Sequence, residues 1–213
     1  MDRVVLATGN RGKLAELSAL LAGCGLEVLP QSAFGIEAAE EDGESFAANA
    51  LIKARHAARL AGLPAIADDS GLEVDALGGR PGIHSARYAG PGSTDADNNA
   101  RLLMELQGVP DPARSARYRC AIVHVRSADD PLPLVCEAAW EGRIGHAPRG
   151  DGGFGYDPLF IVAGSTLTAA EMAPTAKNRA SHRAQALAAL VAALRAGHRG
   201  ARNAPRATGA EVP

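Results

Sequence analysis

An adjacent pair of carboxylates, Asp68 and Asp69, is the first feature of this sequence that could do chemistry. The pair follows an apolar run at residues 65–67, so we expect it at the carboxyl end of a buried strand, where open α/β sheets keep their ligand crevices. Neighbouring side chains of an extended chain point to opposite faces, so only one carboxylate can face a given site. Carboxylates suit Mg²⁺, which usually binds one or two of them together with substrate phosphates. The alternative is an ordinary turn or helix cap.

A second acidic segment, Glu40, Glu41 and Asp42, could supply another carboxylate to the same metal. Charge runs of this kind are most often solvated loops. The residues alone therefore leave both interpretations open.

Residues 8–13, Thr-Gly-Asn-Arg-Gly-Lys, follow a strand pattern and open a helical one. This arrangement brings backbone amides, the positive end of a helix dipole and an ammonium group to one spot, which favours an anion. The segment is not a P-loop, because its glycines are three apart and Leu14 stands where Ser or Thr would hold magnesium. The alternative is a plain strand–helix turn capped by Asn10.

Lysine is rare in this chain: of 22 basic residues, the three lysines are Lys13, Lys53 and Lys177. An ammonium is a compact, flexible charge that suits phosphate, whereas arginine presents a planar fork. Lys53 lies four residues after Asn49 on a predicted helix, where the two form a polar stripe. We expect the three lysines to meet at one phosphate-rich ligand, and the alternative is chance placement on solvated faces.

Glycine and aromatic residues are concentrated between residues 150 and 158. Aromatic residues make up 4% of the chain, yet Phe154 and Tyr156 both lie in this segment. Glycines on both sides of Phe154 let the backbone approach a flat ligand, and the ring offers a stacking face. The alternative is a glycine-rich hairpin whose rings pack inward.

The last predicted helix begins with Ser181 as a natural cap, followed by His182 and Arg183. A cation in the first turn opposes the helix dipole and costs about 0.3–1 kcal/mol unless an anion or acceptor compensates for it. His182 as a capping or core histidine is the alternative. Taken together, the segments require one ligand with phosphates, a metal and a flat ring, which is a nucleotide.

The elements that must position these residues follow from hydrophobic periodicity and turn signals. Strands are expected at residues 3–7, 27–30, 65–67, 117–126, 134–143 and 159–162, and helices at residues 13–22, 45–61, 94–106 and 181–195. Residues 72–92 have no helical period and are expected to form short strands and turns. Early alternation followed by two adjacent long strands predicts an α/β domain with a mixed sheet over residues 1–197. Residues 198–213 are expected to be a disordered tail.

Composition excludes several classes of protein. With 213 residues, 46% of them hydrophobic and 22% charged, the chain fits one globular domain. A net charge of −2 and no arginine stripe argue against binding to nucleic acid or to an anionic membrane. No apolar run approaches the roughly 20 residues of a membrane span, and no signal peptide is expected. Three cysteines without C-x-x-C spacing indicate reduced thiols in a cytoplasmic protein.

Five blocks of residues, in order, carry a resemblance to a known family. They are residues 7–10 with Lys13, Phe46 with Asn49 and Lys53, residues 65–71, residues 78–88, and residues 153–158 followed by 181–183. From residue 4 to about residue 194 the sequence resembles the inosine triphosphatase family, the noncanonical purine nucleoside-triphosphate pyrophosphatases. The resemblance implies hydrolysis of ITP, dITP and XTP to the monophosphate and pyrophosphate. It also implies a homodimer and an elongated mixed sheet flanked by helices, with two lobes around a central nucleotide cleft.

The resemblance also implies a role for each matching residue. Asp69 would be the general base, and Mg²⁺ would bind Asp69 and a glutamate, with Glu41 favoured over Glu40. Lys177 would close over the nucleotide, and His182 and Arg183 would read the 6-oxo group of the purine. The full set expected to bind substrate is Thr8, Gly9, Asn10, Arg11, Gly12, Lys13, Lys53, Ser70, Phe154, Gly155, Tyr156, Asp157, Lys177, His182 and Arg183.

Two other functions compete with this one. A related pyrophosphatase for modified pyrimidine nucleotides would use a similar fold, and a nucleotide sensor would bind without turnover. The acidic pair argues against the sensor, because a protein that only binds needs no base beside the α-phosphate.

Overall fold

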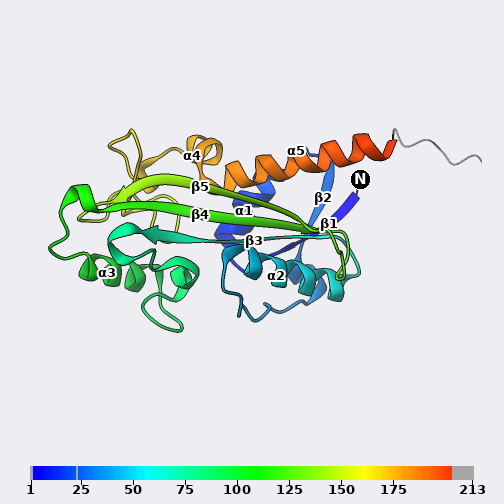
Figure 1. Ribbon diagram of the computed structural model, residues 1–213, viewed down its shortest axis with the longest axis horizontal. Coiled ribbons are helices and arrows are strands. Elements are labelled where there is room, and N and C mark those ends of the chain that lie inside the picture. Colours follow the sequence, from blue (N-terminus) through cyan, green and yellow to red (C-terminus); the bar gives the residue numbers. More distant parts are fainter. Residues whose placement is uncertain (1, 23, 203–213) are drawn as a thin grey trace, which may run out of the picture.

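A six-stranded mixed sheet forms the centre of the computed structural model, which describes residues 2–22 and 24–202 (Figure 1). The strand order is β2-β1-β3-β4-β5-β6, in which β1 runs parallel to β2 and β3 and the remaining neighbours are antiparallel. The strands are β1 (Asp2–Ala7), β2 (Leu26–Pro30), β3 (Ala65–Val74), β4 (Ser115–Val125), β5 (Leu134–Ile144) and β6 (Phe160–Val162). The expected mixed α/β sheet is confirmed.

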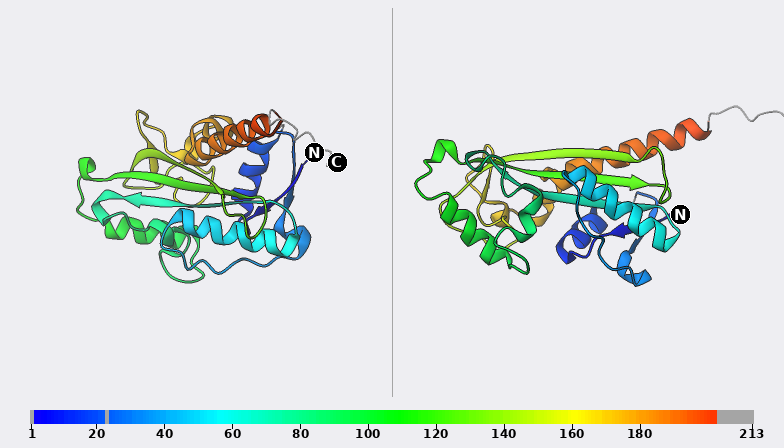
Figure 2. Two further views of the ribbon diagram at one scale, coloured as in Figure 1. Left: turned by 45° about the vertical axis from the view of Figure 1, so that its right-hand side comes forward. Right: turned by 60° about the horizontal axis from the view of Figure 1, so that its bottom comes forward.

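Helices cover both faces of the sheet. The α-helices are α1 (Arg11–Leu21), α2 (Phe46–Ala61), α3 (Asp95–Glu105), α4 (Pro174–Ala180) and α5 (His182–Arg202). Helix α2 packs on one face, and α1 and α5 pack on the other, as both views of Figure 2 show. Short segments of 3-10 helix are η1 (Gln31–Phe34), η2 (Asp75–Leu77), η3 (Gly82–Arg87), η4 (Asp111–Ala113) and η5 (Ala169–Glu171).

Helix α2 shows why these residues form these elements. The Ser45 hydroxyl accepts a hydrogen bond from the Ala48 amide at 3.1 Å, which satisfies one of the free donors at the helix start. Ala50 and Ala54 are fully buried against the sheet, because small side chains at helical spacing let the helix lie close to the strands. Gly62 ends the helix in the left-handed region, where glycine has no steric penalty.

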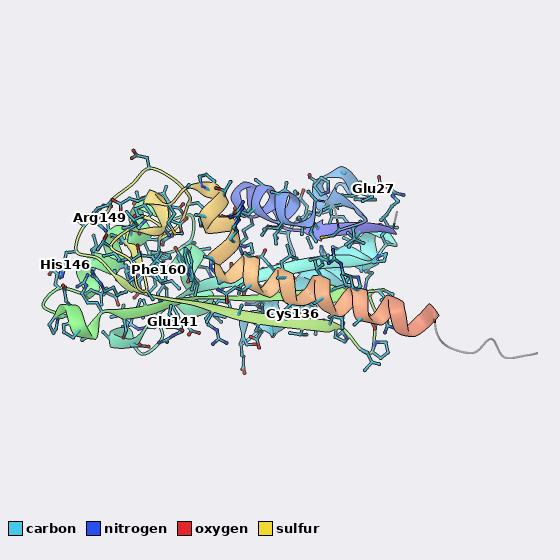
Figure 3. All side chains as sticks on the ribbon, turned by 90° about the horizontal axis from the view of Figure 1, so that it is seen from above. Glu27, Cys136, Glu141, His146, Arg149 and Phe160 are labelled. Atoms are coloured by element: carbon cyan, nitrogen blue, oxygen red, sulfur yellow. The ribbon has the colours of Figure 1, made fainter. Side chains whose placement is uncertain are left out.

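The far end of the sheet carries a second cluster that contains α3, β6 and most of the aromatic residues. Arg114 is buried there and donates to the carbonyls of Leu106, Ile144 and Gly145 at 2.8–2.9 Å. These bonds tie the end of α3 to the end of β5. Seen from above, His146 and Arg149 lie at one end of the molecule and Glu27 at the other (Figure 3). The molecule is therefore elongated, with one lobe at each end of a continuous sheet.

Three expectations from the sequence are wrong in detail. Strand β3 does not stop at residue 67 but continues to Val74, because its whole length pairs with β4. Residues 72–92 form the end of β3 and the turns η2 and η3, not several short strands. Helix α5 continues to Arg202, because alanine and arginine are strong helix formers and no proline interrupts them before Pro205. The first residues of the predicted tail are thus helical, and residues 203–213 lie outside the described residues.

None of the helices in the described part of the chain combines the length and apolar character needed to cross a bilayer. Cys24, Cys120 and Cys136 are free thiols.

Candidate active site

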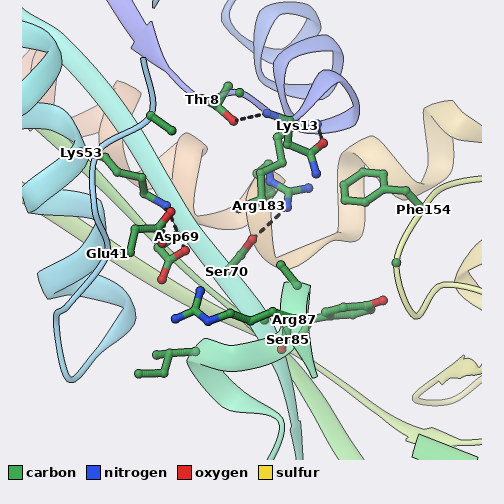
Figure 4. A pocket seen from close by; sticks show the side chains of 18 of the residues that line it. Thr8, Lys13, Glu41, Lys53, Asp69, Ser70, Ser85, Arg87, Phe154 and Arg183 are labelled. Carbon is green, nitrogen blue, oxygen red and sulfur yellow. Dashed lines mark hydrogen bonds and ion pairs between the residues drawn. The ribbon is translucent and has the colours of Figure 1, made fainter. Parts of the chain in front are cut away.

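A cavity of about 330 Å³ opens between the two lobes (Figure 4). One wall comes from the β1–α1 turn, the loop before α2, and α2 itself, and the other comes from η3, α3 and the glycine-rich loop. Lys13, Lys53 and Lys177 all line this cavity, together with Asp69 and Phe154. Three lysines separated by up to 164 positions in the sequence thus meet around one space.

The β1–α1 turn is both a capped turn and a cavity wall. The Asn10 side chain accepts a hydrogen bond from the Lys13 amide at 3.0 Å, and Thr8 Oγ1 accepts one from the Asn10 amide at 3.2 Å. A Cβ on Gly12 would lie 2.8 Å from the Phe154 ring, so glycine is required for the aromatic side chain to reach this turn. The turn is therefore capped by Asn10, as the alternative predicted, and it also lines the cavity.

Asp68 and Asp69 lie within β3 and face opposite sides of the sheet, as expected for neighbours in a strand. The Asp68 carboxylate is fully buried, 3.0 Å from Lys13 Nζ and 3.4 Å from Arg183 Nε. Burial alone would raise its pKa, but Lys13 and Arg183 outweigh burial and hold the pKa of Asp68 well below its usual range. Asp68 does not line the cavity, and it acts as the buried counter-ion of two cations that do.

The Asp69 carboxylate faces the cavity, and each of its oxygens has one donor. Lys53 Nζ lies 3.0 Å from Oδ1, and the Asn49 amide donates to Oδ2 at 3.3 Å. Asn49 in turn accepts from the Gly43 amide at 2.8 Å, which connects the acidic loop to the strand. Burial lowers the pKa of Lys53, but Asp69, Asp68 and Glu41 outweigh it and raise the pKa above the usual lysine value.

The two carboxylates that contact Lys53, those of Glu41 and Asp69, fit a Mg²⁺ site. The Lys53 ammonium lies 3.2 Å from Glu41 Oε2 and 3.0 Å from Asp69 Oδ1, so two carboxylates converge on one positive charge. Two carboxylates with room for phosphate oxygens are what Mg²⁺ commonly uses. Glu40 is exposed and does not line the cavity, which favours Glu41 of the two glutamates. Among the described residues, no group of three or more metal-ligating side chains exists.

At the other end of the cavity, Asp157 organises the glycine-rich loop. Its carboxylate accepts from the Phe154 amide at 2.9 Å, from Lys177 Nζ at 2.6 Å and from the Tyr118 hydroxyl at 3.2 Å. Lys177 Nζ also lies 5.0 Å from the centre of the Phe154 ring. Burial raises the pKa of Tyr118, and the Asp157 carboxylate raises it further, so this hydroxyl remains a donor.

His182 is a neutral, buried ring at the base of the same end. It stacks on Tyr118 with 4.7 Å between ring centres, and burial, followed by the charges of Arg183 and Lys177, lowers its pKa well below the usual value. Its Nδ1 is buried and has no hydrogen-bond partner among the residues that the structure describes. Ser181 caps α5 by accepting from the Ala184 amide at 3.2 Å. The core and the cavity-facing interpretations of His182 both describe it.

The structure brings most of the predicted residues together. Those that line the cavity are Thr8, Gly9, Asn10, Lys13, Glu41, Lys53, Asp69, Ser70, Phe154, Gly155, Tyr156, Asp157, Lys177, His182 and Arg183. Gly12 contributes through its contact with Phe154, and Glu40 lies outside the lining. The Arg11 side chain lies outside the part of the chain that the structure describes.

Sequence reasoning missed several residues at the site. Glu16 contacts both Lys177, at 3.0 Å, and Arg183, and its spacing of three from Lys13 on α1 could have placed it on the same helix face. Asn49 was recognised only as part of a polar stripe. Tyr118 and Arg87 also line the cavity. No local pattern marks Tyr118, and Arg87 belongs to the matching block at residues 78–88, to which no role was assigned.

Residues 4–193 match the model of the Ham1 family. The chain is 60% identical over 194 residues to a dITP/XTP pyrophosphatase of Methylococcus capsulatus, covering 91% of this chain and 96% of the relative. A dITP/XTP pyrophosphatase of Shigella flexneri is 55% identical over 197 residues, covering 92% of this chain and all of the relative.

Solved structures agree with the sequence relatives. A HAM1 protein from Coxiella burnetii superimposes with a TM-score of 0.85 at 47% identity, covering 92% of this chain and all of that one. A nucleoside-triphosphatase / dITP/XTP pyrophosphatase from Mycobacterium abscessus superimposes with a TM-score of 0.71 at 43% identity, covering 88% of this chain and 98% of that one. The family match spans both lobes and the cavity between them, and this chain belongs to the Ham1 family.

Proposed function

We propose that this chain hydrolyses the noncanonical purine nucleoside triphosphates dITP, XTP and ITP to the nucleoside monophosphate and pyrophosphate, and so removes deaminated purines from the nucleotide pool. Relatives that share 55–60% of their residues over nine-tenths of the chain are named dITP/XTP pyrophosphatases. The observation that carries the proposal is the convergence of three lysines, Asp69 and Phe154 on one cavity.

Asp69 is the proposed general base. It would take a proton from a water that attacks the α-phosphorus, the bond from that phosphorus to the bridging oxygen would break, and pyrophosphate would leave. General-base catalysis of this kind contributes about 10²–10⁴-fold to a rate. Lys53 and Asn49 hold the two carboxylate oxygens in place, which orients the base before substrate arrives.

Asp69 and Glu41 are the residues that would hold Mg²⁺. Bound there, the ion would neutralise charge on the phosphate oxygens. Thr8, Asn10, Lys13 and Ser70 would bind phosphates from the β1–α1 turn and from β3, which also line the cavity.

The base would stack on Phe154, and Tyr156 and Asp157 would shape the pocket around it. Arginine and backbone amides are donors, so Arg183 satisfies a carbonyl at C6 but faces another donor when the base is adenine. A mispaired buried polar group costs about 1–3 kcal/mol, and several acting together give larger selectivity. A neutral His182 offers one ring nitrogen as an acceptor and one as a donor, which adds a second polar contact to the same end.

Two further properties belong to this proposal. The family resemblance implies a homodimer, and the three free thiols fit a reducing, cytoplasmic location.

A substrate panel tests the proposal. The protein is incubated with dITP, XTP, ITP, dTTP and ATP in the presence of Mg²⁺, and pyrophosphate and orthophosphate are assayed separately. Pyrophosphate from dITP, XTP and ITP, with little product from ATP, is the expected result. Preference for a pyrimidine nucleotide would support the related pyrimidine enzyme, and binding without turnover would support a sensor.

A further inference from the structure

The cations that line the cavity are almost all neutralised within the protein. Lys13, Lys53, Lys177 and Arg183 together contact five carboxylates, which belong to Glu16, Glu41, Asp68, Asp69 and Asp157. The carboxylates outnumber these four cations, so the set is net negative before any ligand binds. The proposed Mg²⁺ at Asp69 and Glu41 would offset this charge at one place, and a nucleoside triphosphate is a polyanion that an unpaired cation elsewhere in the lining could also attract.

Arg87 also lines the cavity, but unlike these four cations it has no carboxylate partner among the described residues. It is exposed and lines the cavity, and within the described residues its side chain makes no ion pair and no hydrogen bond. Because no carboxylate neutralises it and no partner must be displaced, its guanidinium fork is available to an anion. Arginine is suited to two oxygens of one phosphate, which it can bind with two parallel hydrogen bonds.

The backbone that carries Arg87 is firmly anchored. Arg87 is the last residue of η3, and Ser85, two residues earlier, accepts from the Leu72 amide of β3 at 2.9 Å and donates to the Gly82 carbonyl at 2.6 Å. The Tyr156 hydroxyl donates to the Ser85 carbonyl at 2.8 Å. The turn is thus attached both to the strand that carries Asp69 and to the loop that carries Phe154.

Figure 4 shows the direction of the side chain. The Arg87 guanidinium lies toward the end of the cavity that holds Asp69 and Glu41, and Phe154 lies at the other end. If the purine stacks on Phe154 and the α-phosphorus faces Asp69, the remaining two phosphates extend toward Arg87. We propose that Arg87 binds the β- and γ-phosphates, which leave as pyrophosphate.

This role rests on the proposed function and adds a specific step to it. When the bond to the α-phosphorus breaks, its electron pair leaves on the bridging oxygen, and negative charge grows on the pyrophosphate. A guanidinium that binds this group stabilises the developing charge. The same contact would make free pyrophosphate a good inhibitor and would leave the affinity for the monophosphate product unaffected.

The test compares product inhibition in full-length wild-type protein and in the variants Arg87→Gln and Arg87→Lys. Inhibition constants for inorganic pyrophosphate and for dIMP are measured against dITP hydrolysis with Mg²⁺, together with kcat and KM. For Arg87→Gln we expect pyrophosphate to inhibit at least about tenfold more weakly, dIMP to inhibit within about twofold of wild type, and kcat/KM to fall about 10- to 100-fold. Arg87→Lys keeps the positive charge but loses the planar guanidinium. Its inhibition constant for pyrophosphate and its kcat/KM should lie between those of wild type and Arg87→Gln.

Arg59→Gln is the matched control, because Arg59 is exposed on α2 and does not line the cavity. It should behave as wild type. The assignment would be overturned if pyrophosphate inhibited Arg87→Gln as strongly as wild type, or if inhibition by pyrophosphate and inhibition by dIMP weakened by the same factor. Direct titration of pyrophosphate into wild type and Arg87→Gln, followed by calorimetry, separates this question from the proposed function. If wild type released no pyrophosphate from dITP, the proposed function would fail, and the titration would still decide whether Arg87 binds this anion.

Discussion

Asp68 and Asp69 are neighbours in β3, yet the alternation of a strand gives them different partners and different roles. Asp69 faces the cavity with Lys53 and Asn49, whereas Asp68 is buried with Lys13 and Arg183 on the opposite side of the sheet. Asp69 carries the proposed chemistry of the site, and Asp68 holds in place two cations that line the cavity. The two carboxylates can therefore be separated by substitution.

Replacing Asp69 removes the proposed base together with one of the two proposed Mg²⁺ ligands and the ion pair to Lys53. We expect Asp69→Asn to lower kcat for dITP by about 10²–10⁴-fold, with nucleotide affinity within about tenfold of wild type, because the amide keeps the size of the carboxylate but cannot accept the proton. Steady-state kinetics and nucleotide titration measure the two quantities. A variant with near-normal kcat would remove Asp69 from the role of base.

Replacing Asp68 should affect stability instead. Asp68→Asn leaves the buried Arg183 and the partly buried Lys13 without their shared counter-ion, and breaking a buried pair costs about 3–5 kcal/mol. Urea unfolding should show a clear loss for Asp68→Asn and a smaller one for Asp69→Asn. Equal stability of both variants and wild type would contradict the separation of roles.

The buried neutral His182 links stability to pH. In the unfolded chain a histidine takes up a proton near pH 6.5, whereas the folded protein holds the pKa of His182 well below that value. Below pH 6.5 the unfolded state therefore binds more protons, and the free energy of unfolding falls by up to about 1.4 kcal/mol per pH unit. Urea unfolding of wild type and His182→Gln at pH 8 and pH 5 measures this. The variant should lose less stability on acidification, and parallel curves would show that His182 can be protonated in the folded protein.

At the scale of elements, one close approach fixes the second wall of the cavity. A Cβ on Gly71 would lie 2.5 Å from Ser85 Oγ and would also meet the Gly82 carbonyl, so η3 can lie against β3 only because residue 71 is glycine. Gly71 is two positions after Asp69, and η3 carries Arg87. The distance between Asp69 and Arg87 thus depends on the absence of a side chain at Gly71.

Gly71→Ala should push η3 away from the strand. Overpacking of this kind costs about 1–3 kcal/mol of stability, and the displaced turn should also raise KM for dITP. Gly9→Ala is a control for stability, because a Cβ there meets nothing within 4 Å. Urea unfolding of both variants checks the prediction. It would be wrong if the unfolding midpoint of both variants lay at the same urea concentration as that of wild type.

The elements show what sequence patterns can and cannot predict. Helix α2 and the start of α3 were predictable because their caps are local: Ser45 accepts from Ala48, and Thr94 and Asp97 form a reciprocal pair. The length of β3 was not predictable, because it depends on pairing with β4, more than 40 residues later. The same holds for Tyr118, and for the place of Arg87 at the cavity: its block was recognised in the sequence, but its position depends on the packing of η3 against β3.

The whole molecule places the cavity between two lobes that share one sheet. Lysine rarity pointed to three positions that do line one cavity, yet their convergence could be seen only in the fold. The sequence did not predict that Glu16 and Asp157 would both contact Lys177, because these contacts depend on how α1, α4 and the glycine-rich loop meet.

Assembly is also a property at this scale. The proposed homodimer predicts a solution mass of twice the 21.8 kDa chain. Sedimentation equilibrium over a range of protein concentrations measures the mass directly. A single species at the mass of one chain throughout that range would contradict the dimer.

The phosphorus atom that water attacks shows directly whether the triphosphate lies in the cavity with its α-phosphorus beside Asp69. Hydrolysis of dITP is carried out in water enriched in ¹⁸O, and the products are separated and analysed by mass spectrometry. Attack at the α-phosphorus beside Asp69 predicts one ¹⁸O atom in dIMP and none in the pyrophosphate. Label in pyrophosphate, or release of labelled orthophosphate, would mean that the triphosphate does not lie in the cavity as this geometry requires.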